Sequence, residues 1–310
     1  MNRQPPSLTR REMVALSSVA LAGLPLRASW AAAGAAGDAF RIVFYADVHA
    51  RTEWETPRAL AMAAAAINAE TPELVVAGGD LITDGFQSSA AAVEPRWQAY
   101  LEMHRSLRPR VEPVLGNHDL VAALPEDGTP PSVDPRQRFR TAFSLERTYR
   151  SVAAGGYRLL ILDSVSVVGG DEKYRGLIEP DQLGWLAREL ESIDRATPII
   201  LATHLPLLTG FYQATEGATA AAPANRVVVN NREVLELFAD RNLLLVLQGH
   251  LHVAEMLRWQ GATFITGGAL CGKWWRGAWH GTGEGFGVLT LRPDRVDWEY
   301  RGYGWKSLRP

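Results

Sequence analysis

Only one cysteine, Cys271, occurs in this chain of 310 residues. A single thiol excludes an intramolecular disulfide framework and also a metal site built from several thiolates. The formal net charge is only −2 at pH 7, so charge alone gives the chain no general attraction to nucleic acid or to anionic membranes. Internal repeats and heptad patterns are also missing, which argues against a repeat protein or a coiled coil. With 47% hydrophobic residues, the chain is able to bury the large core of an enzyme-sized globular protein.

The N-terminal region has an apolar stretch, but this stretch is too short to span a membrane. It runs from Val14 to Leu26, well short of the ~20 residues that a spanning helix needs. Arg10 and Arg11 precede it, and small residues follow it, an arrangement typical of a cleaved export signal. We therefore predict that residues 1–31 are an export signal and that the mature protein is periplasmic or secreted.

The paired arginines of this leader resemble a twin-arginine (Tat) signal, which implies the twin-arginine export machinery as a partner. Arg27, after the apolar stretch, favours this route because such signals often carry a positive charge there. A general secretory signal with a basic start is the alternative. The leader contains no cysteine, which argues against a lipoprotein anchor.

Five apolar runs later in the chain each end in residues of the types that bind metals. The residues that follow the runs are Asp47 and His49, Asp80, Asn117 to Asp119, His204, and His250 and His252. Short runs rich in leucine and β-branched residues, separated by helical patterns, are typical of buried strands in an α/β domain. Because loops at the carboxyl ends of such strands meet at one edge of the sheet, we expect these side chains to lie close together.

Helix and strand signals alternate through the rest of the chain. Helices are expected over residues 58–70, 95–107 and 232–240, and another is expected to begin at Pro180. Hairpins are expected within residues 149–162, 255–266 and 286–300. Parallel-type units followed by antiparallel strands predict a layered sandwich with helices outside.

The predicted cluster offers only nitrogen and oxygen donors, which suit Mn, Fe, Zn, Co or Ni better than a thiolate-preferring ion. Three aspartates, one asparagine and five histidines exceed the three or four ligands of one catalytic zinc. Two ions that share a carboxylate would use the set, and such a pair is suited to an in-line displacement at phosphorus. Gly78 and Gly79 are expected to let the backbone turn sharply before Asp80.

The order of these motifs carries a family resemblance over residues 40–253. The motifs are Asp47-x-His49, Gly79-Asp80, Gly116-Asn117-His118-Asp119, His204 and Gly249-His250-x-His252. In this order, each after a predicted strand, they resemble the calcineurin-like metallophosphoesterase superfamily. The resemblance implies a four-layer α-β-β-α sandwich of two mixed sheets flanked by helices. It implies a single domain over residues 38–310, with strands from residues 254–310 completing the second sheet.

The resemblance also implies a role for each motif residue. A first ion would be held by Asp47, His49, Asp80 and His252, and a second by Asp80 as a bridge with Asn117, His204 and His250. Both would be divalent transition-metal ions, with Mn, Fe or Zn favoured. His118 would be the general acid or a phosphate-binding group, hydrogen-bonded to Asp119, which would orient it. The implied activity is hydrolysis of a small phosphoester by a metal-bridging hydroxide.

The native substrate stays open at this point. The segment Gly79–Gly85 is similar to the cyclic-nucleotide phosphodiesterase-like branch, but related monoesterases and phospholipid-cleaving enzymes share it, so monoester and diester preferences are both possible. A non-catalytic, metal-dependent scaffold that binds phosphate or a partner is the alternative of another class. It is disfavoured because no motif position is substituted.

Regions outside the motifs are expected to shape the substrate site. Two insertions, at residues 120–140 and 207–225, leave from the predicted rim and are expected to form lids or binding walls. The segment 267–280 is rich in tryptophan and arginine, which suits a phosphate-bearing base or lipid, but core packing explains the tryptophans equally well. We expect Asp84 and Asp163 to be turn or structural residues.

Overall fold

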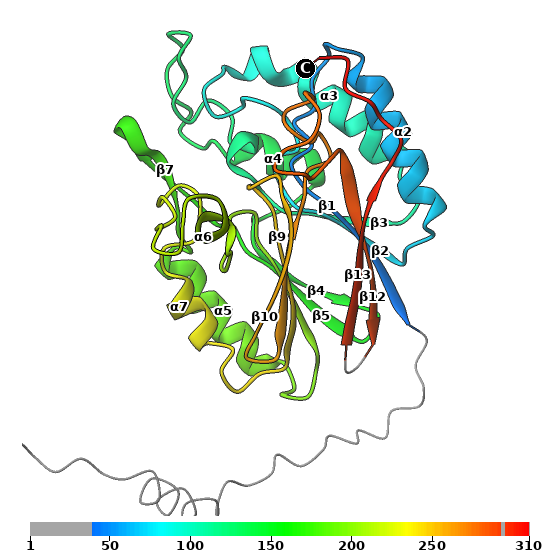
Figure 1. The fold of residues 1–310 in the computed structure, drawn as a ribbon. Helices are drawn as coiled ribbons and strands as arrows, with labels where there is room; N and C mark the ends of the chain where they lie inside the picture. Colours follow the sequence, from blue (N-terminus) through cyan, green and yellow to red (C-terminus); the bar gives the residue numbers. More distant parts are fainter. Residues whose placement is uncertain (1–38, 293–294, 310) are drawn as a thin grey trace, which may run out of the picture. The chain divides into compact units, whose positions relative to one another are not determined.

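Two mixed β-sheets form the centre of the computed structural model (Figure 1). The structure describes residues 39–292 and 295–309, so the predicted export signal over residues 1–31 lies outside the described residues. Within the described residues, no helix is both long and apolar enough to cross a membrane.

The first sheet has the strand order β13-β12-β1-β2-β3. Its strands are β1 (Phe40–Tyr45), β2 (Leu74–Ala77), β3 (Arg110–Pro113), β12 (Gly285–Arg292) and β13 (Arg295–Gly302). Strands β1, β2 and β3 are parallel, and β12 pairs antiparallel with β1. The carboxyl ends of β1, β2 and β3, which precede three of the predicted motifs, therefore lie at the same edge.

The second sheet has the strand order β10-β11-β9-β8-β5-β4. Its strands are β4 (Arg150–Ala154), β5 (Tyr157–Ile161), β8 (Ile199–Ala202), β9 (Leu243–Gln248), β10 (Ala254–Trp259) and β11 (Ala262–Gly267). The central strands β5, β8, β9 and β11 are parallel, and both edge strands are antiparallel. A separate two-stranded ribbon consists of β6 (Val165–Gly169) and β7 (Lys173–Gly176).

The C-terminal strands correct one expectation about the sheets. Strands β10 and β11 join the second sheet as expected, but β12 and β13 extend the first sheet beside β1. Leu289 and Leu291 of β12 belong to the same buried cluster as Ile42 and Phe44 of β1. This placement buries the apolar face of β12 and covers a sheet edge that β1 would otherwise expose.

Alternation along the strands separates the core into layers. Ile42 and Phe44 pack in a cluster with residues of the second sheet such as Ile161, whereas Val43 and Tyr45 belong to a cluster that reaches the helices. The helices are α2 (Thr56–Ala69), α3 (Ala90–Ser106), α4 (Gln137–Phe143), α5 (Pro180–Ser192), α6 (Phe211–Thr215) and α7 (Asn231–Glu236). Figure 1 shows α2 and α3 beside the first sheet and α5 and α7 beside the second. The expected two mixed sheets flanked by helices are confirmed.

Helix α3 begins five residues before the expected start at Pro95. Proline favours the first turn of a helix, which is why the sequence pattern placed the start there. Here Pro95 lies inside the helix and removes one backbone hydrogen bond. The three alanines before Val93 extend the helix, and Val93, Trp97 and Tyr100 bury one face of it.

Candidate metal centre

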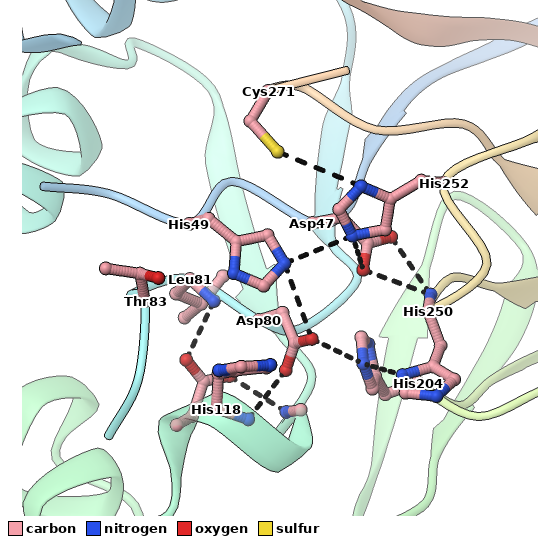
Figure 2. A network of polar contacts seen from close by, with 12 residues as sticks. Asp47, His49, Asp80, Leu81, Thr83, His118, His204, His250, His252 and Cys271 are labelled. Carbon is pink, nitrogen blue, oxygen red and sulfur yellow. Dashed lines mark hydrogen bonds and ion pairs between the residues drawn. The ribbon is translucent and has the colours of Figure 1, made fainter. Parts of the chain in front are cut away.

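The loops that follow β1, β2, β3, β8 and β9 bring their polar side chains together in one cluster (Figure 2). They bring together all seven predicted metal ligands, and every one of these side chains is buried. The seven are Asp47, His49, Asp80, Asn117, His204, His250 and His252. The structure therefore assembles the predicted set, while the role of each residue as a ligand stays a prediction.

Asp80 lies at the centre of this group. Its Oδ2 atom is 3.1 Å from Nε2 of His204 and 3.7 Å from Nε2 of His49. Its Oδ1 atom accepts a hydrogen bond of 2.8 Å from the backbone N–H of His118. One carboxylate oxygen of Asp80 thus faces imidazoles from two different loops.

The remaining donors divide into two groups on either side of Asp80. On one side, Nε2 of His252 lies 3.1 Å from Nε2 of His49 and 3.4 Å from Oδ1 of Asp47. On the other side, Nδ1 of His250 lies 3.3 Å from Nε2 of His204. Asp47, His49 and His252 thus lie together on one side of Asp80, and His204 and His250 lie together on the other, while the assignment of each residue to an ion stays a prediction.

Backbone carbonyls orient three of the imidazoles. Nδ1 of His204 donates to the Gly78 carbonyl at 2.8 Å, and Nδ1 of His252 donates to the Gly272 carbonyl at 2.6 Å. For His250 the other nitrogen, Nε2, lies 3.1 Å from the Asn225 carbonyl. A carbonyl only accepts, so a ring nitrogen that bonds to it carries a proton, and in a neutral imidazole the opposite nitrogen then presents a lone pair to the centre.

Burial sets the protonation of most imidazoles in the centre. It lowers the pKa of His49 and of His250 well below the usual range, and it lowers the pKa of His252 to about 4. Burial also opposes charge on His204, but the carboxylate of Asp80 outweighs it and raises the pKa of His204 to about 9. Neutral imidazoles are the form that binds a cation, so His49, His250 and His252 are in the form needed.

The two carboxylates respond differently to the same burial. Burial raises the pKa of Asp47 well above its usual range. For Asp80 burial acts in the same direction, but nearby His204 and His118 outweigh it and hold the pKa of Asp80 well below its usual range. A divalent cation near Asp47 would offset the cost of its buried charge.

Asn117 gives an independent test of whether the centre fits a metal. Its side-chain Oδ1 atom is buried and has no hydrogen-bond partner among the described residues. A buried amide oxygen without a partner is costly and calls for an explanation, and amide oxygen is a donor that divalent cations accept. With the carboxylates and neutral imidazoles around it, the donor set fits two divalent cations.

The backbone around the centre is strained. Asp47, His49, Asp80, His250 and His252 have φ values of 52°, 44°, 53°, 71° and 58°, in the left-handed region that non-glycine residues rarely adopt. Gly79, with φ of 93°, was expected to provide the sharp turn before Asp80, and a Cβ atom there would lie 2.6 Å from Nδ1 of His204. Strain concentrated in this way is characteristic of functional sites.

His118 corrects the predicted pairing with Asp119. The carboxylate of Asp119 instead accepts backbone hydrogen bonds from Leu81 at 2.7 Å, from Ile82 at 3.3 Å and from Gly116 at 2.8 Å. Residues 117–119 form a 3₁₀ turn, in which successive side chains point about 120° apart, so neighbours cannot face each other. Asp119 therefore holds loops in place and does not orient the imidazole.

Asp84 takes the position that was expected for Asp119. Its backbone N–H donates to Nδ1 of His118 at 3.1 Å, and its carboxylate Oδ1 lies 3.9 Å from the same nitrogen. Nδ1 accepts this bond, so Nε2 of a neutral His118 carries the proton. The His118 ring lies 4.7 Å from the His49 ring, and its side chain is 26% exposed. The sequence indicated only a turn at Asp84, because its contact depends on the path of the loop.

The second insertion reaches the centre, as a predicted binding wall would. Asn225, at its end, provides the carbonyl that faces His250, and Nη1 of Arg226 lies 3.4 Å from Nε2 of His250. Arg226 was not predicted, and a lone arginine in a loop gives no signal of its own. Asp163 matches its expected structural role, because its carboxylate accepts hydrogen bonds from Arg136 and Thr148.

The tryptophan-rich segment divides into two kinds of residue. Trp275 is 2% exposed and donates from Nε1 to the His49 carbonyl at 2.9 Å, so the packing interpretation holds for it. Trp274 is 38% exposed, and its ring lies 4.3 Å from the His252 ring. Cys271 is buried, with Sγ 3.9 Å from Nδ1 of His252.

Comparison with known proteins gives a family match and several structural likenesses. Residues 40–254 match the family model described as calcineurin-like phosphoesterase. Among curated proteins, none matches this sequence. A dimetal phosphatase from Danio rerio superposes with a TM-score of 0.62 at 18% identity, covering 85% of this chain and 96% of that one.

Two further solved structures share the fold. A purple acid phosphatase from yellow lupin seeds superposes with a TM-score of 0.54 at 16% identity, covering 86% of this chain and 52% of that one. GAP50, described as the anchor in the inner membrane complex of Plasmodium, gives 0.52 at 15% identity and covers 87% of each chain. At these identities the likenesses show the fold alone.

Proposed function

The chain belongs to the calcineurin-like phosphoesterase family, and on that premise we propose that it is a metal-dependent hydrolase of phosphoester bonds. The observation that carries the proposal is the position of Asp80. One of its carboxylate oxygens faces His204 on one side and His49 on the other. A carboxylate placed in this way can serve two cations at once, which is the arrangement that phosphoester hydrolysis uses.

The residues divide between two cations. Asp47, His49, Asp80 and His252 would hold one, and Asp80, Asn117, His204 and His250 would hold the other. The donor set favours Mn, Fe or Zn. When bound, such ions supply Lewis-acid charge and an activated nucleophile at neutral pH. The carbonyls of Gly78, Gly272 and Asn225 keep the imidazoles oriented for this purpose.

His118 would act on the substrate directly. Because Asp84 donates to Nδ1 of His118, the proton on Nε2 is available to a phosphoryl oxygen or to the departing oxygen. The partial exposure of His118 leaves room for a substrate beside it. Proton donation of this kind contributes ~10²–10⁴-fold to the rate of such reactions.

Arg226 adds positive charge on the opposite side of the centre, beside His250. Within the described residues, its guanidinium contacts Nε2 of His250 rather than a carboxylate, so its charge is available to a bound anion. A guanidinium at this distance from a metal ligand is suited to a phosphoryl oxygen. We infer that it stabilises negative charge on the bound phosphoester.

A direct test measures hydrolysis of 4-nitrophenyl phosphate and of bis(4-nitrophenyl) phosphate in the presence of Mn²⁺. We expect turnover of at least one ester, and the ratio of the two rates gives the monoester or diester preference. Asp80→Ala is the control and is expected to lose most of the activity. A wild-type preparation that holds two ions but turns over neither ester would support the scaffold alternative instead.

A further inference from the structure

A row of aromatic rings extends outward from the metal centre. Trp274 lies 4.3 Å from the ring of His252 at an interplanar angle of 32°, and Trp279 lies 6.2 Å from Trp274. His280 follows at 4.5 Å from Trp279, and Phe211 of α6 lies 5.1 Å from His280. We call Trp274, Trp279, His280 and Phe211 the aromatic row. It joins the loop after β11 to the insertion that contains α6.

The structure holds Trp274 in this exposed position. Trp274 and Trp275 have φ values of 47° and 66°, which are unfavourable for tryptophan. The turn is fixed on one side by Trp275, which donates to the His49 carbonyl, and on the other by Gly272, whose carbonyl accepts from His252. Contacts of this turn with His49 and His252, two of the candidate ligands, therefore keep the large side chain of Trp274 partly exposed beside His252. They do so although the backbone of the turn is strained.

Trp274 also lies on the same side of the centre as His118. Its ring is 6.0 Å from the ring of His49, which is itself 4.7 Å from the ring of His118. A phosphoryl group placed at His118 would bring its ester substituent alongside Trp274. The ring of Trp279 stands at 70° to the ring of Trp274, so that the two indoles meet at an angle beside this position.

We propose that the aromatic row binds a planar aromatic ring in the ester substituent of the substrate, and that Trp274 is the residue that determines this specificity. This inference rests on the proposed hydrolase function. The substrate would be a phosphoester in which a sugar separates the phosphoryl group from a nucleobase-like ring. Base stacking on an aromatic side chain accepts any planar ring and does not depend on hydrogen bonding.

The charges along the row favour such a ring over a hydrocarbon chain. Nζ of Lys273 lies 4.9 Å from the ring of Trp279, and Lys273 and Arg276 are exposed beside Trp274. An acyl chain on this surface would displace water from Lys273 and Arg276 and would offer these charges no hydrogen bonds in return. A nucleobase stacks on the indole through its face and offers polar edges to the cations.

The test uses two phosphonates in which a methylene group replaces the ester oxygen, so that neither is hydrolysed. One is the analogue of adenosine 5′-monophosphate and the other that of ribose 5-phosphate, which lacks only the base. Calorimetric titration of the Mn²⁺-loaded protein is expected to show about tenfold tighter binding of the adenosine analogue. In Trp274→Ala this preference should fall to near one, while Trp274→Phe should keep most of it.

Trp259 supplies the matched control, because it is 58% exposed at the far end of β10. Trp259→Ala should keep the full preference, and metal content is measured for each variant. If the wild type bound both phosphonates with equal affinity, the inference would be overturned while the proposed function would stand. The same holds if Trp274→Ala lost affinity for both phosphonates equally, so that the ratio of the two affinities was unchanged. Failure of both phosphonates to bind would also overturn the inference, and it would remove the proposed function as well if the same preparation hydrolysed neither 4-nitrophenyl phosphate nor bis(4-nitrophenyl) phosphate.

Discussion

His118 has one ring nitrogen engaged and the other free, and this difference sets what the residue can do. Nδ1 accepts from the backbone of Asp84, so Nε2 is left as a donor toward the open side of the centre. The carboxylate of Asp84 lies near Nδ1 and is able to stabilise the ring when it is charged. Asp119 contributes only to the loop structure beneath.

His118→Asn should therefore change the dependence of the rate on the leaving group. We expect both metals to be retained, little loss with nitrophenyl esters and ~10²-fold or greater loss with alkyl phosphoesters, because only a basic alkoxide needs the proton. Rates with a series of esters of graded leaving-group pKa provide the measurement. An equal loss across the series would mean that His118 binds the phosphoryl oxygens, and loss of a metal would make it a ligand.

Asp84→Asn and Asp119→Asn separate the contributions of the two carboxylates that lie near His118 in the structure or next to it in the sequence. Asp84→Asn should give a milder form of the His118→Asn pattern, of about tenfold, because Asp84 acts only through the imidazole. Asp119→Asn should lower the melting temperature and affect all esters alike, since one of the two oxygens that accept from the backbone is replaced by an NH2 group that cannot accept. If Asp119→Asn changed the dependence on the leaving group and Asp84→Asn only lowered the melting temperature, His118 would be paired with Asp119 instead.

The sequence is informative about residues that follow strands and much less so about residues in loops. Asp47 and Asp80 could be placed together because they follow β1 and β2, neighbouring parallel strands whose ends share an edge, and His204 and His250 likewise follow the neighbouring parallel strands β8 and β9. Arg226 and Trp274 could not, because their contacts depend on how irregular loops return to the centre. The partner of His118 was mispredicted for the same reason.

At the level of helices and strands, the turns that follow the strands bring the candidate metal ligands together, and several residues of these turns have unfavourable positive φ angles. Gly79 follows β2 with φ of 93°, and an added Cβ atom there would lie 2.6 Å from Nδ1 of His204 and 2.9 Å from the backbone nitrogen of Gly116. Gly156, in the β4–β5 turn, has a similar φ of 86° but has no atom within 4 Å of an added Cβ. The two glycines differ only in what surrounds them.

This pair allows close packing to be separated from backbone conformation. Gly156→Ala should lower the free energy of unfolding by about 1 kcal/mol, the cost of a left-handed alanine. Gly79→Ala should lower it by about 1–3 kcal/mol more, because the Cβ collides with His204, and it should also reduce metal content. Chemical denaturation and elemental analysis measure the two effects. Equal destabilisation with unchanged metal content would show that the approach to His204 is unimportant.

Elements with clear boundaries in the sequence were predicted well. The hairpins over 149–162 and 255–266 form β4–β5 and β10–β11, and Pro180 begins α5. The sheet to which the C-terminal hairpin belongs could not be predicted, because its strands have the same apolar alternation in either sheet. Only the burial of Leu289 and Leu291 with β1 decides it.

At the scale of the whole molecule, two sheets bring loops from distant parts of the chain to one centre. β1 and β9 lie in different sheets, yet the backbone N–H of His250 donates to the Asp47 carboxylate at 2.9 Å. The α-β-β-α arrangement was predictable from the family resemblance, whereas the packing of the sheets across the centre needed the structure. GAP50 shows that this fold also occurs in a protein described as an anchor.

We also propose that the folded protein is exported after metal loading, through the twin-arginine signal in residues 1–31. Replacing Arg10 and Arg11 together by lysine should leave the precursor in the cytoplasm, which cell fractionation would detect. The N-terminus of exported protein is expected near Ala32. Unimpaired export of the double variant would indicate the general secretory route.

Asp80 is proposed to join two cations in one hydrolytic centre, and elemental analysis of an active preparation, with activity measured on the same sample, is the decisive test. We expect about two transition-metal ions per chain, and loss of metal together with most of the activity in Asp80→Ala. An active wild-type preparation that holds one ion or none would show that Asp80 does not join two cations.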